Sequence, residues 1–273
     1  MKIRPYVLKE TNWGEVRKTR FNVAVLPWGA TEAHNYHLPY GTDSYLGEDV
    51  AIESARKAWE RGAKVVVLPC VPFGVNTGQI DVPLCMNMNP STQLMVLKDL
   101  IQVLDHHRVQ KLVILNAHGG NHFKQMIREV YLDYPGVFVC SLNWWQFADP
   151  DAIFDDAGDH AGELETSAMM HLRPDLNRNF EDAGPGTSIP YRIKAMREGK
   201  VTSHRIWNRA TVDTGVGDPK ASTPDKGRRF VEEATDQIAD FLVELASVQV
   251  DDLHESGHNF DDVHHSDSYP WRK

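Results

Sequence analysis

The sequence lacks the features that mark secreted, membrane-spanning or nucleic-acid-binding proteins. No apolar run approaches the roughly 18 residues that span a membrane, and the first residues hold no apolar core of signal-peptide length. Lysine and arginine form no cluster and the formal net charge is -9, so neither nucleic acid nor a membrane is an expected partner. The three cysteines include no C-x-x-C pair. This favours free thiols in the cytoplasm and argues against a thiolate zinc site.

Short apolar runs alternate with amphipathic segments over the first half of the chain. The runs typical of buried strands are residues 23–28, 64–72, 111–116 and 136–142. Apolar residues at helical spacing occupy residues 45–59, 92–107 (with Ser91 as N-cap) and 123–132. The alternation predicts β-α-β units, and therefore an α/β fold with three layers, α/β/α, around a mostly parallel central sheet.

The second half of the chain is less regular. We expect a helix over residues 162–172, irregular structure with a hairpin near 201–212, and a last helix that begins at Pro224. The chain is long enough for one sizeable core. We therefore predict a single domain over residues 1–247, followed by a polar tail over residues 248–273.

The segment after the first predicted strand carries the residue types of a metal site. Alternate side chains of an extended segment share a face, so Glu32 and His34 point the same way. Asp43 adds a second carboxylate a short loop later. Such oxygen and nitrogen ligands suit Zn²⁺ or Mn²⁺. The plainer alternative is a polar loop with surface histidines.

Further polar and aromatic residues follow the other predicted strands. His118 comes after the third strand, Trp144 and Trp145 after the fourth, and His160 shortly afterwards. Parallel strands end on one edge of their sheet, where ligands bind. This convergence favours a metal site over a surface loop.

A glycine pair directly follows His118. Gly119 and Gly120 would let a ligand approach the backbone closely, and Asn121 begins the next segment. A phosphate-binding turn is the alternative. Neither G-x-G-x-x-G nor G-x-x-x-x-G-K-[ST] is present to support it.

Three motifs, in this order, resemble those of the creatininase (creatinine amidohydrolase) family: GATEAHNYHLPYGTD, LNAHGGNH and DHAGELETS. The resemblance implies a compact α/β fold, a homohexamer, and a centre of two divalent ions, Zn or Mn, that hydrolyses a C–N bond of a small amide. Position by position, it implies the metal ligands Glu32, His34, Asp43 and His118, with Asp43 bridging both ions. The family's further glutamate falls on Gly120, so we expect Glu163 to replace it and doubt creatinine as the substrate.

The remaining assignments concern proton transfer and substrate contact. Two divalent ions lower the pKa of a water and polarise a carbonyl. Histidine titrates near neutral pH, so we expect His160 to protonate the leaving nitrogen, with Asp159 orienting it. Glu165 fits a catalytic or a supporting role equally well. Trp144 and Trp145 would line the pocket for a flat substrate, beside Gly119, Gly120 and Asn121.

Two alternatives to this amidohydrolase function stay open. They are a formamide deformylase of pyrimidine- or purine-like metabolism and a non-catalytic ligand-binding relative.

Overall fold

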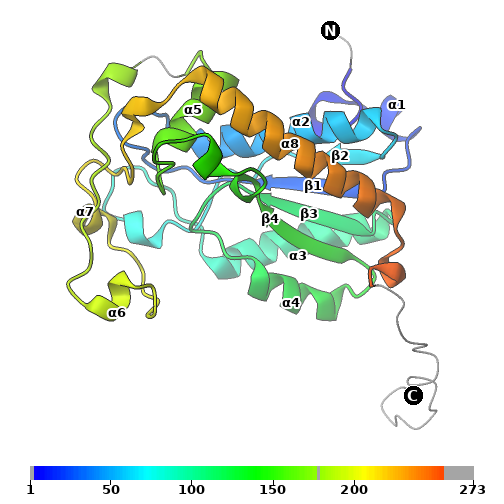
Figure 1. Cartoon of the computed structure of the whole chain (residues 1–273). Coiled ribbons are helices and arrows are strands. Elements are labelled where there is room, and N and C mark those ends of the chain that lie inside the picture. Colours follow the sequence, from blue (N-terminus) through cyan, green and yellow to red (C-terminus); the bar gives the residue numbers. More distant parts are fainter. Residues whose placement is uncertain (1–2, 177–178, 255–273) are drawn as a thin grey trace, which may run out of the picture.

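A computed structural model describes residues 3–176 and 179–254. At its centre lies a four-stranded sheet in the order β2-β1-β3-β4 (Figure 1). The strands are β1 (Val23–Trp28), β2 (Val65–Val67), β3 (Lys111–Asn116) and β4 (Phe138–Asn143). Every neighbouring pair is parallel, as the β-α-β alternation predicts.

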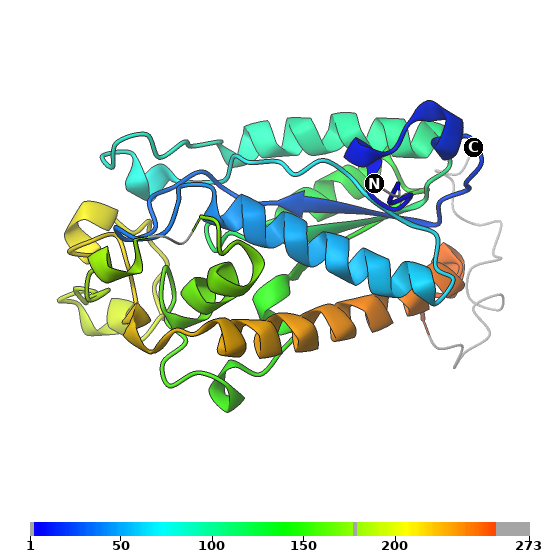
Figure 2. The same ribbon diagram turned by 90° about the horizontal axis from the view of Figure 1, so that it is seen from above.

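Helices cover both faces of the sheet. One face carries α2 (Thr42–Glu60), α5 (Glu163–Leu172) and α8 (Pro224–Ser247), and the other carries α3 (Pro90–His106) and α4 (Lys124–Asp133) (Figures 1 and 2). A separate apolar core fills each interface, because successive side chains of a strand point to opposite faces. The predicted three-layer architecture is confirmed.

The remaining elements are short. The helices are α1 (Trp13–Val16), α6 (Lys194–Arg197) and α7 (Trp207–Ala210). The 3-10 turns are η1 (Leu8–Glu10), η2 (Thr77–Gln79), η3 (Trp144–Gln146), η4 (Pro150–Ala152), η5 (Phe180–Asp182), η6 (Pro219–Ala221) and η7 (Val250–Asp252). The segment with α6 and α7 extends beyond one end of the sheet (Figure 1).

The register of the central strands aligns their carboxyl ends. Trp28 pairs with Asn116, and Asn116 pairs with Asn143, so these strands end in one row. Asn116 Nδ2 donates to Asn143 Oδ1 and to the carbonyl of His118, which fixes the turn after β3. The polar segments after β1, β3 and β4 therefore leave the sheet side by side.

Several predicted boundaries differ from the structure. Helix α2 begins at Thr42, which places Asp43 in its first turn rather than in a loop. Asn89, not Ser91, is the N-cap of α3, and its side chain makes no capping hydrogen bond. The hairpin near 201–212 is wrong: this stretch holds α7, and one isolated bridge joins Ser188 to Thr211.

No helix among residues 3–176 and 179–254 has both the length and the apolar character to cross a bilayer. Of the predicted tail, residues 255–273 lie outside the described part of the chain, and the preceding residues include η7.

Candidate metal centre

Side chains from three distant parts of the sequence meet where the strands end. Their oxygen and nitrogen atoms form three overlapping groups, within each of which the potential ligand atoms lie within 4.8 Å of one another. The groups are Glu32, Asp43 and His118; His34, Asp43 and Glu165; and Glu32, His34 and His160. All of these residues are buried except Glu165, which is half-buried. Asp43 belongs to two groups and offers a different oxygen to each histidine.

The orientation of His34 is fixed by the backbone. Its Nδ1 lies 3.1 Å from the carbonyl oxygen of Glu32, and a carbonyl can only accept, so Nδ1 carries the proton. Nε2 then faces Asp43 Oδ1 at 2.9 Å and Glu165 Oε2 at 3.9 Å. In the neutral ring, the lone pair therefore points into the carboxylate cluster, as a metal ligand requires.

The other two histidines follow the same pattern. His118 Nε2 donates to the carbonyl of Val75 at 3.1 Å, and its Nδ1 faces Glu32 Oε1 at 2.8 Å. His160 Nε2 donates to the carbonyl of Ala33 at 2.8 Å, and its Nδ1 lies 3.8 Å from Glu32 Oε1. Each ring is held by one nitrogen and presents the other to the same cluster of carboxylates.

The electrostatics reflect an excess of negative charge. Burial lowers the pKa of His34, but the carboxylates of Asp43, Glu165 and Glu32 together outweigh burial and raise it to about 10. The pKa of His118 is raised well above its usual value, because Glu32 and Asp43 likewise outweigh burial. Burial opposes ionisation of Asp43, yet His34 holds its pKa below the usual range. Asp43 Oδ2 is buried and lies 3.1 Å from His118 Nδ1, but it accepts no well-aligned hydrogen bond among the described residues, which leaves it available as a ligand for a cation.

Glu32 is held from outside the cluster by two residues that sequence reasoning missed. Gln79 Nε2 donates to Glu32 Oε2, and Cys85 Sγ donates to Gln79 Oε1. Cys85 Sγ also accepts from the backbone N–H of Ala33. All of these groups are buried. This chain of hydrogen bonds, the relay from Cys85 through Gln79 to Glu32, uses only Oε2 of the carboxylate. The other oxygen, Oε1, faces His118 and His160. In the sequence, the signal for this region is the unusual length of the connection over residues 73–89, which is longer than a plain loop between a strand and a helix.

The structure places Glu163 away from the cluster. Its carboxylate accepts from Lys226 Nζ and from the backbone N–H groups of Asp155 and Asp156. Glu163 therefore belongs to none of the three groups, contrary to the expectation. Glu165 is the glutamate of this helix that lies with His34 and Asp43, and the N–H of Ala161, in the left-handed region at φ 51°, donates to it at 2.6 Å.

Asp159 and the two tryptophans also lie away from the cluster. Asp159 is exposed and pairs with Arg205 at 2.9 Å, so the carbonyl of Ala33, not Asp159, orients His160. Trp144 is 1% exposed and packs edge-on against Phe230 in the core. Trp145, half-buried, packs on the same core. The aromatic residue beside His160 is instead Trp207, with ring centroids 5.2 Å apart.

The glycine pair has a packing role as well as a turn role. A Cβ at Gly120 would lie 2.4 Å from both His118 Nε2 and the carbonyl oxygen of Val75, whereas nothing lies within 4 Å of one at Gly119. Asn121 is buried and committed to structure: its Oδ1 accepts from Val75 N and Gln93 Nε2. A glutamate side chain at position 120, where the family resemblance places one, therefore has no space here while His118 bonds to Val75.

This constellation of buried carboxylates and imidazoles coincides with a family match. The family model for creatininase, described as creatinine amidohydrolase, matches residues 9–242. The chain belongs to the creatininase family. The match covers every residue of the three groups, so the family resemblance seen in the sequence motifs is confirmed.

The proteins that are similar to this chain are named for different activities. The mycofactocin precursor peptide peptidase of Mycolicibacterium smegmatis is 28% identical over 80% of this chain and 83% of its own. The creatinine amidohydrolase of Pseudomonas putida is 26% identical over 81% and 89%. A Bacteroides fragilis protein named after creatinine amidohydrolase is 41% identical, with a TM-score of 0.88 over 93% of this chain and 100% of its own.

Creatininases solved in a Zn–Zn form, as a mutant, and in an Mn form share the fold. They have TM-scores of 0.70 and 0.71, and each is 24% identical over 89% of this chain and 99% of its own. Together the comparisons make this chain a creatininase-family hydrolase whose substrate they leave open.

Proposed function

We propose that this protein is a metal-dependent amidohydrolase that cleaves a C–N bond of a small, cyclic or formylated amide. The proposed centre holds two divalent ions, Zn²⁺ or Mn²⁺. Its proposed ligands are Glu32, His34, Asp43, His118 and Glu165. Asp43 would serve as a ligand in two of the groups, because its Oδ1 faces His34 and its Oδ2 faces His118.

The observation that carries the proposal is the shared orientation of the histidines. His34, His118 and His160 each donate one ring N–H to a backbone carbonyl and turn the other nitrogen toward buried carboxylates. Metal-binding histidines are held in this way by outer groups that fix the tautomer. Ordinary surface histidines have no need of such anchors. Divalent ions bound here would acidify a water molecule and polarise a substrate carbonyl.

The chain's own residues supply orientation and proton transfer. His160 is fixed by the Ala33 carbonyl and by Trp207, and its Nδ1 faces the cluster. We assign it to the proton that the leaving nitrogen requires. Glu165 is the most exposed carboxylate of the cluster, so substrate would enter from its side. The side chains of Glu32 and Asp43 are only 1% and 2% exposed, so bulk water has little access to these two carboxylates.

The decisive experiment measures metal content and hydrolysis together. Elemental analysis should find close to two ions per wild-type chain, falling toward one in Glu165→Gln. Glu163→Gln is the matched control, since it changes the neighbouring carboxylate that contacts Lys226. Creatinine, N-formyl amines and short peptides are then offered to the metal-loaded protein. A wild type with no metal, or equal metal loss in both variants, would overturn the proposal.

Cleavage of a peptide bond is the second candidate, and one observation favours it. The 28%-identical Mycolicibacterium smegmatis relative is named as a peptidase. A peptide bond is also an amide, so the same centre could serve. Release of a free amino terminus from short peptides, without turnover of formamides or creatinine, would favour this candidate over the first.

Three expectations stay predictions: the single domain over residues 1–247, the homohexamer and the cytoplasmic location. Light scattering on the purified protein tests the oligomeric state. Limited proteolysis tests whether cleavage is confined to the region after residue 247.

A further inference from the structure

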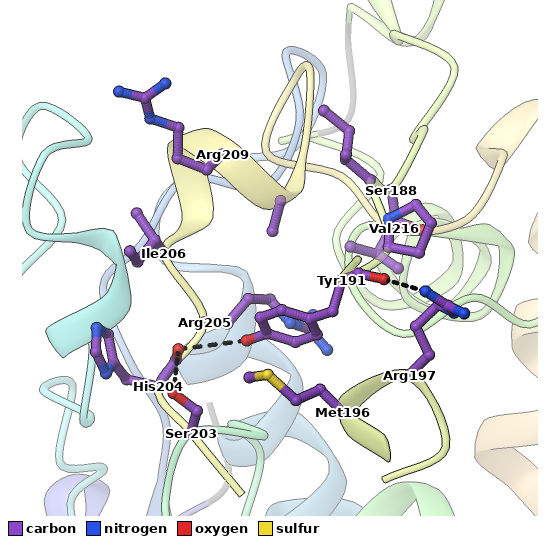
Figure 3. Close-up of a pocket in the computed structure, with 13 residues that line it drawn as sticks. Ser188, Tyr191, Met196, Arg197, Ser203, His204, Arg205, Ile206, Arg209 and Val216 are labelled. Carbon is purple, nitrogen blue, oxygen red and sulfur yellow. Dashed lines mark hydrogen bonds between the residues drawn. The ribbon is translucent and has the colours of Figure 1, made fainter. Parts of the chain in front are cut away.

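A cavity lies apart from the carboxylate cluster, in the irregular segment between α5 and α8. It has a volume of about 460 Å³ and is lined by residues between Ser188 and Val216 (Figure 3). The ring of Tyr191 crosses its middle with Met196 beside it, and Arg209 points away from the ring (Figure 3). Every lining residue is neutral or basic: none is Asp or Glu.

The charge of this segment is opposite to that of the whole chain. Between residues 190 and 210 the sequence has one acidic residue, Glu198, while the chain has a formal net charge of -9. The basic residues in the same stretch are Arg192, Lys194, Arg197, Lys200, Arg205 and Arg209. These basic residues are two to five positions apart, so they form no continuous run in the sequence, but their shared sign favours an anionic ligand at this place.

The guanidinium groups of two lining arginines keep donors available. Arg197 Nη1 donates to the carbonyls of Tyr191 and Arg192, and Arg205 Nη1 donates to Asp159. No partner among residues 3–176 and 179–254 engages the Nε or Nη2 of either group. Guanidinium donors of this kind bind carboxylate or phosphate oxygens in pairs.

Apolar side chains make up about half of the lining: Ile189, Pro190, Met196, Ile206, Ala210 and Val216. Ile189 is 51% exposed, and Ile206 is 48% exposed. Exposed aliphatic side chains beside unengaged arginine donors suit a ligand that has both an anionic head and an apolar body.

From this combination we propose that the cavity is a binding site for a small organic anion, a carboxylate or a phosphate ester with a short apolar chain. Arg197 and Arg205 bind the head, and Ile189, Met196 and Ile206 contact the body. The site is separate from the proposed hydrolytic centre and holds whether or not the chain hydrolyses amides.

The cavity is nevertheless joined to the carboxylate cluster. Arg205 lies over the ring of Trp207 at 4.8 Å, Trp207 packs against His160 at 5.2 Å, and the rings of His160 and His34 are 4.1 Å apart. Val216 lines the cavity and forms a backbone bridge with His160. An anion bound to Arg205 would therefore contact a residue that packs on Trp207, the aromatic neighbour of His160.

Calorimetric titration of the metal-loaded protein with hexanoate, hexyl phosphate and uncharged 1-hexanol tests the proposal. We expect at least one of the anions to bind and 1-hexanol to bind much more weakly. Arg205→Gln should weaken anion binding by about tenfold or more, the scale of one lost charge-assisted contact. Arg229→Gln, the same change at an exposed arginine of α8, should leave it unchanged. Which anion binds more tightly identifies the head group.

Two further measurements separate this site from the metal centre and from misfolding. Anion binding should persist after dialysis against a chelator, because the site does not use the metal. Arg205→Lys keeps the charge and should retain part of the affinity if Arg205→Gln proves poorly folded by circular dichroism. Equal affinity in Arg205→Gln and Arg229→Gln, no binding of either anion, or loss of binding with the metal would each overturn the proposal.

Discussion

Lys226 of α8 donates to the almost fully buried carboxylate of Glu163 on α5, while Glu165, two residues later, faces the carboxylate cluster. Successive residues of an α-helix are turned by about 100°, so these two glutamates point in nearly opposite directions. One glutamate therefore joins two helices, and the other faces the site. Substitution of Glu163 should therefore change the stability of the protein, whereas substitution of Glu165 should change its metal content.

Glu163→Gln should lower the stability of the protein and leave its metal content unchanged. The substitution removes the ion pair with Lys226. In this pair the side chain of Glu163 is 1% exposed, whereas that of Lys226 is 22% exposed. We expect a loss of about 2 kcal/mol in the free energy of unfolding, below the full cost of breaking a buried pair because Lys226 also contacts Asp155. Urea unfolding and elemental analysis measure the two properties. Metal loss matching that of Glu165→Gln would contradict this division of roles.

Gly120→Ala should weaken metal binding, and Gly119→Ala should not. The new Cβ at position 120 meets the His118 ring and the Val75 carbonyl, so the ring must turn and lose its anchoring hydrogen bond. Loss of such an outer contact reduces metal affinity by about 10- to 100-fold. Competition with a fluorescent chelator measures the affinity of both variants. Equal affinities would show that His118 does not depend on its anchor.

Gln79→Leu tests the relay behind Glu32. The substitution keeps the approximate size of the side chain but removes the donor to Glu32 and the acceptor for Cys85. We expect metal affinity to fall by about tenfold or more, since Glu32 would lose its orientation. Gln102→Leu, the same change at an exposed position of α3, is the control. The relay has no positioning role if the two variants bind metal alike.

Asp49→Asn should stabilise the protein at alkaline but not at acidic pH. Burial raises the pKa of Asp49 to about 6, although Arg173 partly opposes it. The folded state thus favours the protonated acid. The contribution of Asp49 to the free energy of unfolding is therefore present at acidic pH and is lost as the pH rises through 6. The amide carries no charge and avoids this cost. We expect a gain of about 1–2 kcal/mol at pH 8, discounted for partial exposure, and little change at pH 4.

Urea unfolding of wild type and Asp49→Asn at both pH values provides the measurement. Asp49 lies on α2 outside the ligand groups, so metal loading can be held constant. A pH-independent difference between the two proteins, or a less stable variant at pH 8, would contradict the assigned shift.

The sequence determines the sheet and most of the cluster through local patterns. Strands β1 and β3 follow their apolar runs to the residue. The parallel topology then forces Glu32, His34 and His118 toward one edge. These residues lie next to strand ends. Two rules suffice to place them there: alternate side chains of an extended segment share a face, and parallel strands end on the same edge of their sheet.

The parts that could not be predicted depend on tertiary contacts. Both glutamates of the third motif fit the sequence pattern, and only the position of Lys226 on α8 assigns Glu163 to packing. Trp144 and Trp207 look alike in sequence, yet one enters the core and the other borders His160. Gln79 reaches Glu32 across 47 positions of sequence, a distance that no local pattern spans.

The order in which the cluster's residues occur along the chain limits when it can form. Glu32, His34 and Asp43 leave the ribosome early, but His118 follows 75 positions after Asp43, and the helix bearing Glu165 is synthesised later still. Helix α8, whose Lys226 holds Glu163, comes last. A nascent chain therefore carries only fragments of the cluster. At the proposed metal centre, a retained ion would show that synthesis has passed the third motif. A chain that stops before this motif would lack part of the ligand set and would not retain the ion.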